Sequence, residues 1–229
     1  MNALSIDCAV SKLTVSAKKD TQCVKLTYDI GMKQSEKILP AIDFVMREAA
    51  LTTKDLSYTA LTMGPGSFTG LRLGLSALKA LTLSNGVPLY GVPSLEAYAW
   101  SFFKNDSLVL SVIEAKEDEY FYQIFENGKK IQEAEDDEVS VILSKLDKTK
   151  QITLCGPAAK TCAESLLKLD SALKIKTYLP ENDATESLFI IAEEMIKNNI
   201  PPLADYDGPL YVRKSEAEIV LEKKMAEAN

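Results

Sequence analysis

The chain has 229 residues, a formal net charge of −7 and a pI near 4.9, so it lacks the basic surface with which proteins that bind nucleic acid alone displace counterions from phosphates. It contains no histidine, which excludes Ser-His and Cys-His catalysis and every histidine-ligated metal site. No apolar run approaches the roughly 20 residues that span a bilayer, so we expect a soluble cytoplasmic protein.

The first half of the chain alternates between short β-type runs and amphipathic helical segments. Strands are expected at residues 4–10, 13–17, 23–28, 59–63 and 88–92, and helices at residues 35–50, at residues 68–84 and from residue 94. Ser35 is the expected N-cap of the first helix, where Glu36 favours the positive end of the helix dipole. Pro40 falls just inside this helix, where a missing N–H group costs little. Gly86 is expected to end the second helix in the left-handed conformation.

The second half repeats the order of elements found in the first half. Strands are expected at residues 108–113, 119–125, 129–134, 151–155 and 174–178, and helices at residues 139–146, 159–169 and 185–198. The order strand-strand-strand-helix-strand-helix thus occurs twice, which predicts an α/β protein with two mixed-sheet lobes. We divide the chain into a first lobe, residues 1–105, and a second lobe, residues 106–229, whose extended tail ends in a charged helix at residues 215–228.

The stretch M-G-P-G-S-F-T-G-L-R-L-G, residues 63–74, looks at first like a phosphate-binding loop. A Walker loop requires a lysine where Leu71 stands, and the dinucleotide pattern G-x-G-x-x-G fails because one residue too many precedes Gly70. Both nucleotide interpretations therefore fail. The stretch predicts a sharp strand-to-helix turn in which Ser67 or Thr69 caps the helix. A weak contact of the helix start with phosphate or carboxylate remains open.

The helix that follows this turn carries leucines on two faces, so it should be covered by its own sheet on one side and by a partner on the other. Arg72 lies in its first turn, where a cation opposes the helix dipole at a cost of roughly 0.3–1 kcal/mol. Arg72 is therefore expected to meet a carboxylate, in this chain or in another.

Several strings together resemble one family, from near the start of the chain to its end. They are L-S-I-D-C, Q-S-E-K-I-L-P-A-I, M-G-P-G-S-F-T-G-L-R-L-G, G-V-P-L-Y-G-V-P-S-L-E-A, V-I-E-A-K-E-D-E-Y, C-G-P-A-A-K and P-L-Y-V-R. The sequence resembles the bacterial TsaB (YeaZ) family, whose members are needed to make threonylcarbamoyladenosine in tRNA. The family's signature turn corresponds here to Gly64, Pro65, Gly66, Ser67, Phe68, Thr69 and Gly70.

The resemblance implies an actin-like ATPase superfamily fold with two ribonuclease H-like lobes. It also implies a noncatalytic role, with no cofactor and no metal, as a partner of the catalytic protein TsaD, which the ATPase TsaE joins. In the family the first two long helices of each partner pack as a four-helix bundle, and the isolated protein is expected to self-associate through the same surface. The residues placed there by the resemblance are Ser35, Glu36, Ile38, Leu39, Ile42, Met46, Arg72, Leu75 and Leu78.

The chain departs from the family at two places. Gln34 stands where the family usually has histidine, and Glu114-Ala115-Lys116 replaces an aspartate-alanine-arginine segment. These changes put in doubt any role assigned to those positions, but not the family.

An active kinase or ATPase of the same superfamily is the main alternative, because Asp7 and Glu114 end the first strand of each half, where such enzymes hold nucleotide and magnesium. The segments that follow contain no glycine, so phosphate could not approach their backbone closely, and Asp7 is interpreted as a strand-end cap. A peptidase is disfavoured because a histidine-based metal pair is impossible, although a Ser-Lys arrangement remains open. Direct tRNA binding is a further alternative, and a single feature supports it. That feature is a cluster of cations near the C-terminus, Arg213, Lys214, Lys223 and Lys224.

Overall fold

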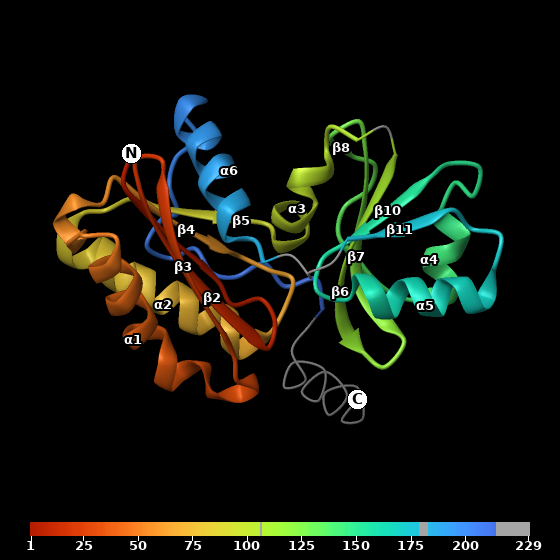
Figure 1. Cartoon of the computed structure of the whole chain (residues 1–229), viewed down its shortest axis with the longest axis horizontal. Coiled ribbons are helices and arrows are strands. Elements are labelled where there is room, and N and C mark those ends of the chain that lie inside the picture. Colours follow the sequence, from red (N-terminus) through yellow and green to blue (C-terminus); the bar gives the residue numbers. More distant parts are fainter. Residues whose placement is uncertain (106, 179–182, 214–229) are drawn as a thin grey trace, which may run out of the picture.

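The computed structural model describes residues 1–105, 107–178 and 183–213, so the helix expected at residues 215–228 lies outside the described residues. The strands form two separate sheets, with helices packed on each (Figure 1). The first sheet has the order β3-β2-β1-β4-β5. Its strands are β1 (Ala3–Asp7), β2 (Lys12–Lys19), β3 (Gln22–Asp29), β4 (Tyr58–Thr62) and β5 (Leu89–Val92).

The first three strands form an antiparallel meander, as the polar turns between them predict, whereas β1, β4 and β5 are parallel. The parallel pairs are connected through helices, which is the arrangement that a parallel crossover requires. The helices of this half are α1 (Gln34–Glu48), α2 (Phe68–Asn85) and α3 (Ser94–Ala99), with short 3₁₀ turns at Gly31–Lys33, Thr53–Asp55 and Trp100–Phe102.

The second sheet has the order β11-β10-β6-β7-β8, and β9 also pairs with β7. Its strands are β6 (Leu108–Lys116), β7 (Glu119–Glu126), β8 (Lys129–Lys130), β9 (Glu135–Glu138), β10 (Ile152–Cys155) and β11 (Ile175–Thr177). The remaining helices are α4 (Val139–Lys145), α5 (Ala159–Leu169) and α6 (Thr185–Lys197). The two mixed sheets predicted from the repeated order of elements are confirmed.

Three local predictions are wrong. Ser35 does not cap α1, because a 3₁₀ turn leads directly into the helix and Gln34 is already helical. Pro40 is the seventh residue of α1, beyond the first turn, so it removes one internal hydrogen bond of the helix. The strand expected at residues 129–134 is reduced to β8, and the acidic segment after it forms β9, whose charges the sequence pattern does not associate with a strand.

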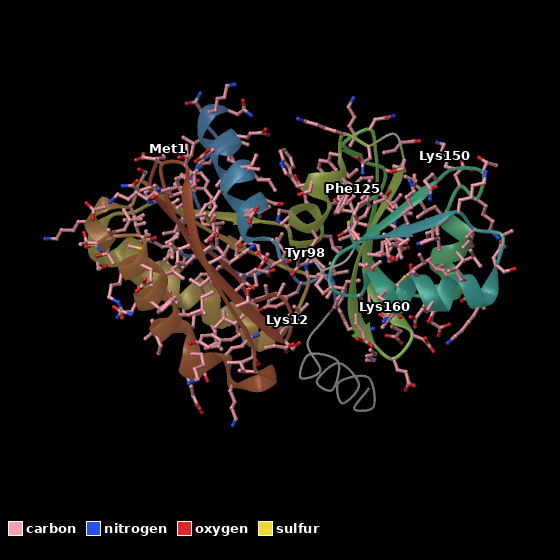
Figure 2. All side chains as sticks on the ribbon, viewed as in Figure 1. Met1, Lys12, Tyr98, Phe125, Lys150 and Lys160 are labelled. Atoms are coloured by element: carbon pink, nitrogen blue, oxygen red, sulfur yellow. The ribbon has the colours of Figure 1, made fainter. Side chains whose placement is uncertain are left out.

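Apolar side chains fill one core beneath α1 and α2, a second beneath α4 and α5, and a third between the two sheets. The third core contains Tyr58 and Leu95 from the first half together with Ile113 and Leu188 from the second. Tyr98 lies between the two sheets in Figure 2 and belongs to this core. Helix α6 packs on β1, β4 and β5, so late residues cover the first sheet. The division of the chain at residue 105 stays a prediction.

After α6 the chain returns along the first sheet in a segment that we name the strap, residues 203–213. Its first residue, Leu203, donates its N–H to the Leu89 carbonyl of β5 (2.8 Å), and the N–H of Leu210 donates to the Met63 carbonyl (2.7 Å). Its last residue, Arg213, forms ion pairs with Glu119 and Asp136 of the second sheet. The strap therefore connects both sheets.

Candidate functional site

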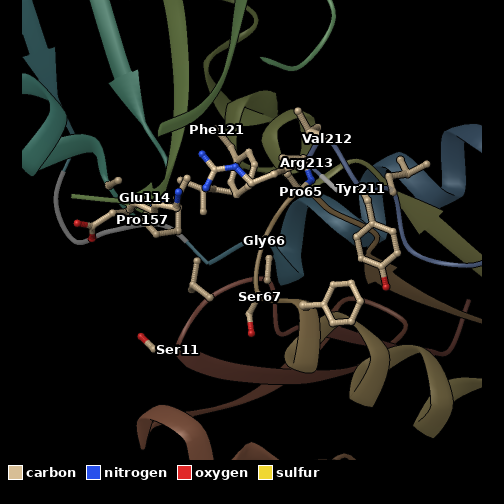
Figure 3. A pocket seen from close by; sticks show the side chains of 18 of the residues that line it. Ser11, Pro65, Gly66, Ser67, Glu114, Phe121, Pro157, Tyr211, Val212 and Arg213 are labelled. Carbon is tan, nitrogen blue, oxygen red and sulfur yellow. The ribbon is translucent and has the colours of Figure 1, made fainter. Parts of the chain in front are cut away.

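A cavity of about 1050 Å³ lies between the two halves. Its walls are formed by the turn after β1, the start of α2, the end of β6, the start of α5 and the end of the strap (Figure 3). Four charged residues line it: Lys12, Glu114, Lys116 and Arg213. Its volume slightly exceeds the roughly 300–1,000 Å³ typical of small-molecule sites, so geometry alone permits a ligand.

The glycine-rich turn borders this cavity, but backbone groups of the chain occupy the space that a phosphate would need. The N–H of Gly64 donates to Ser94 Oγ (3.0 Å). A Cβ at Gly64 would overlap the Leu210 carbonyl oxygen, and a Cβ at Gly66 would overlap the Ala9 carbonyl oxygen. These glycines therefore allow close contact with the chain's own backbone instead of with a nucleotide.

Ser67 anchors the other end of this turn. Its N–H donates to the Ala9 carbonyl (2.6 Å), and its Oγ accepts from the N–H of Gly70 (3.2 Å). Ser67 is thus the N-cap of α2, as predicted, whereas Thr69 is exposed in the first turn of the helix. Two N–H groups at the helix start are satisfied within the protein, which weakens the case for an anion there.

Asp7 ends β1 and is buried, with 3% of its surface exposed. Its Oδ1 accepts from the N–H of Ala9 (3.2 Å) and the hydroxyl of Thr62 (3.1 Å). Its Oδ2 accepts from the hydroxyl of Tyr98 (2.8 Å) and the N–H of Ala184 (3.1 Å). Burial raises the pKa of this carboxyl, although the hydrogen bonds from Ala184, Tyr98 and Ala9 oppose the shift. Asp7 is therefore a structural cap with four donors, and a metal ion would have to displace them.

Glu114 is expected to end its strand as Asp7 does, but β6 continues to Lys116, and Glu114 is exposed and lines the cavity. No glycine lies between β6 and β7, where the turn residue Asp118 has a positive φ of 58°. Nearby, Nζ of Lys116 lies 3.9 Å from Oε2 of Glu119. In the described ranges, no group of three or more acidic or cysteine side chains is arranged to hold a metal ion.

The predicted interface residues of α1 and α2 divide into exposed and buried sets. The exposed ones are Ser35, Glu36, Leu39 and Arg72, and the buried ones are Ile38, Ile42, Met46, Leu75 and Leu78. The buried set packs in the first core, directly beneath the outer face of the two helices. Apolar side chains are nevertheless exposed on both helices: Leu39 at 64% and Leu83 at 80%, with Phe44 and Phe68 partly exposed.

Arg72 contacts the Phe68 ring of α2 and the Tyr211 ring of the strap instead of a carboxylate. Its guanidinium carbon lies 3.8 Å from the centre of the Phe68 ring, and its Nε donates to the Tyr211 hydroxyl (3.0 Å). The Phe68 and Tyr211 rings stack at 4.8 Å. Among the described residues, Arg72 has no carboxylate partner, so the prediction of a carboxylate within this chain is wrong there. A carboxylate from another chain stays a prediction.

Gln34 joins the start of α1 to the turn after β1. Its buried Nε2 donates to the carbonyls of Val10 (2.6 Å) and Ser11 (3.0 Å), which line the cavity. A Cβ at Gly70 would lie 2.9 Å from its Oε1, so the first turns of the two helices are adjacent. Position 34 therefore has a defined structural role despite its departure from the family.

Sequence reasoning did not identify the partners of Asp7 or the contacts of the strap. Tyr98 and Ala184 are distant from Asp7 in the chain, and no local pattern indicates their contact. Lys79 was also missed: its ammonium group donates to the carbonyls of Ala204, Asp205 and Asp207. A lysine in an otherwise apolar stretch of α2 was the available signal.

Comparisons with known proteins agree with these features. The model of the family "TsaD: tRNA N6-adenosine threonylcarbamoyltransferase" matches residues 31–219. The TsaB protein of Buchnera aphidicola is 29% identical over 153 residues, which are 65% of this chain and 73% of the relative. The TsaB protein of Bacillus subtilis is 27% identical over 127 residues, which are 55% of this chain and 56% of the relative.

The solved structure of YeaZ from Pseudomonas aeruginosa matches with a TM-score of 0.72 at 17% identity, covering 92% of this chain and 99% of that one. This similarity shows that the chain and YeaZ share a fold, and the two expected mixed sheets are confirmed. No helix among the described residues is long and apolar enough to cross a membrane. With a family-model match over most of its length and TsaB relatives along much of it, the chain belongs to the TsaB (YeaZ) family, within the wider TsaD family.

Proposed function

We propose that this protein is a noncatalytic partner in the biosynthesis of tRNA threonylcarbamoyladenosine, and that it binds a TsaD-type catalytic subunit through the outer face of α1 and α2. Its curated TsaB relatives are named as proteins of that biosynthesis. The observation that carries the docking surface is the exposure of Leu39 and Leu83, one on each helix. Burying these two side chains at an interface would contribute roughly 1–2 kcal/mol each.

A noncatalytic role is supported by how the chain uses the groups that bind nucleotide in enzymes of this superfamily. Asp7 is occupied by four donors, and the turn between β4 and α2 is filled by backbone of Ala9 and Leu210. The third core fixes the two halves against each other with apolar contacts, which opposes the domain closure that many nucleotide-cleaving enzymes require. A cytoplasmic location, contact with TsaE and self-association of the isolated chain belong to the same proposal.

The test uses charged substitutions at exposed positions. Leu75 is unsuitable because 8% of its surface is exposed, so Leu75→Glu would place a charge in the first core and unfold the protein. Leu39→Glu and Leu83→Glu should instead leave the melting temperature unchanged and weaken binding to purified TsaD at least tenfold. Leu169→Glu, at a leucine on α5 that is 53% exposed, is the matched control and should bind normally. Normal binding by both α1 and α2 variants would show that the surface is wrong.

The absence of catalysis is tested by reconstitution. ATP hydrolysis and tRNA modification should be found when the chain and TsaD are combined with the other components, and not with the chain alone. Turnover by the single purified chain would contradict the noncatalytic role.

A second candidate is an ATPase or kinase with its own nucleotide site, which the volume of the cavity favours. Calorimetry with magnesium ATP and the isolated chain distinguishes the two. Tight binding that is lost when the cavity residue Glu114 is changed to lysine would support this alternative and not the partner role.

A further inference from the structure

We propose that the strap is a third element of the partner-binding surface, beside α1 and α2, and that Tyr206 is its main contact with the catalytic subunit. This inference rests on the proposed function, because it extends the surface assigned there. One face of α2 carries a row of residues at helical spacing: Arg72, Ser76, Lys79 and Leu83.

Two members of this row hold the strap. Lys79 donates to the carbonyls of Ala204 (3.3 Å), Asp205 (2.5 Å) and Asp207 (2.7 Å). An ammonium group has three N–H donors, so all of them are directed at one turn. Two helical turns nearer the start of α2, Arg72 binds Tyr211. The strap therefore runs alongside α2 in the opposite direction, and its outward side chains extend the same surface.

The turn at residues 204–207 is rigid for its length. Its two ends are joined by a bond from the Asp207 N–H to the Ala204 carbonyl (3.1 Å) and another from the Ala204 N–H to Asp207 Oδ2 (2.8 Å). Tyr206 is fully exposed at its tip. An aromatic side chain on a fixed backbone loses little conformational freedom when it binds, and tyrosine is enriched among the residues that dominate interfaces.

Charge indicates which chemistry the partner presents there. Asp205 and Asp207 flank Tyr206, while the nearby charge of Lys79 is directed inward to backbone carbonyls. Asp205 is exposed and forms no ion pair within the described residues. The tip of the turn is therefore aromatic and acidic, which suits an arginine or lysine that packs on the ring and faces the carboxylate. Because the strap lies along α2, its occupant is the one proposed for the helix surface, a TsaD-type subunit, which would present a cationic side chain to the turn.

The experiment measures the affinity of the purified full chain for TsaD by calorimetry. Tyr206→Ser should weaken binding about tenfold or more at an unchanged melting temperature, and Asp205→Asn should weaken it less and reduce its salt dependence. Leu169→Ser is the matched surface control. Lys79→Met tests whether Lys79 positions the turn. This variant should raise amide hydrogen exchange at residues 203–208 and weaken binding to TsaD. The double variant with Tyr206→Ser should bind no more weakly than Tyr206→Ser alone.

Failure of this inference is distinct from failure of the proposed function. If Leu39→Glu abolishes binding while Tyr206→Ser and Lys79→Met bind normally, the strap is not part of the surface and the helix surface stands. If Tyr206→Ser alters self-association of the chain but not its affinity for TsaD, the occupant is a second copy and the inference is overturned. If the unmodified chain does not bind TsaD, both are wrong.

Discussion

Replacement of Asp7 by asparagine separates a structural carboxylate from a magnesium ligand. The Asp7 carboxylate accepts from two backbone N–H groups and two hydroxyls. An asparagine offers one acceptor oxygen in place of two, and its NH₂ group faces one N–H and one hydroxyl in either orientation. The hydroxyl can rotate and accept, but the N–H of Ala9 or of Ala184 is left without a partner. The cost of one such group is about 1–3 kcal/mol, or a fall of about 2–12 °C in melting temperature for a chain of this size.

The pH dependence of this cost follows from the raised pKa of Asp7, which burial causes. Between the unfolded pKa of about 3.9 and the higher folded value, the folded protein binds more protons than the unfolded chain. The free energy of unfolding of the original protein therefore decreases as the pH rises through this window. Asparagine does not titrate, so the destabilisation caused by Asp7→Asn should be larger at pH 4 than at pH 7.

Urea unfolding at the two pH values measures this difference, with Asp20→Asn at an exposed turn as the control. The reconstituted tRNA modification should persist at a temperature where the Asp7→Asn variant is folded. An equal or larger destabilisation at pH 7 would refute the assignment of a raised pKa. Complete loss of modification by a folded variant would refute the structural role and favour a magnesium ligand.

Gly70→Ala should destabilise the protein by about 1–3 kcal/mol, because the new Cβ would overlap the Cys8 carbonyl oxygen. Gly208→Ala has open space around it and should be neutral or stabilising by up to about 1 kcal/mol, so similar urea midpoints for the two variants would contradict this packing. The hydrogen bond from Lys145 lowers the pKa of Glu135 in the folded protein. The ionised Glu135 therefore stabilises the fold above its pKa in the unfolded chain, and this stabilisation is lost as the pH falls through its pKa in the folded protein. Glu135→Gln should therefore show a shallower loss of stability between pH 5 and pH 3, and an unchanged slope would be inconsistent with the ion pair.

Helix α2 was the most predictable part of the candidate site, because its signals are local. Ser67 precedes the helix as a side-chain cap, and Gly86 follows it with a φ of 69°. The start of α1 was less predictable: a short 3₁₀ turn continues into the helix and uses Gln34, so the serine that follows has no free helix end to cap. Local sequence thus predicts a helix more reliably than its first residue.

The buried contacts could not be predicted because they join distant parts of the chain. Asp7 meets Thr62, Tyr98 and Ala184, which lie 55, 91 and 177 residues away in the sequence. The path of the strap could not be predicted for the same reason. It depends on contacts with Lys79 and with β5, which are distant in the sequence, and not on any periodicity of the strap itself. Apolar patterning likewise placed Leu75 and Leu78 on α2 without deciding whether the chain's own core or a partner covers them.

The position of α6 bears on how the chain folds during synthesis. The face of the first sheet that α6 covers includes β1, β4 and β5, all of which leave the ribosome long before residues 185–197. Until then Tyr58, Ala60 and Val92 have no cover from α6. Nascent chains should therefore expose an apolar sheet face until residues 185–197 have been made, which makes them substrates for chaperones that bind such surfaces. A chain shortened before α6 should stay in that state and aggregate.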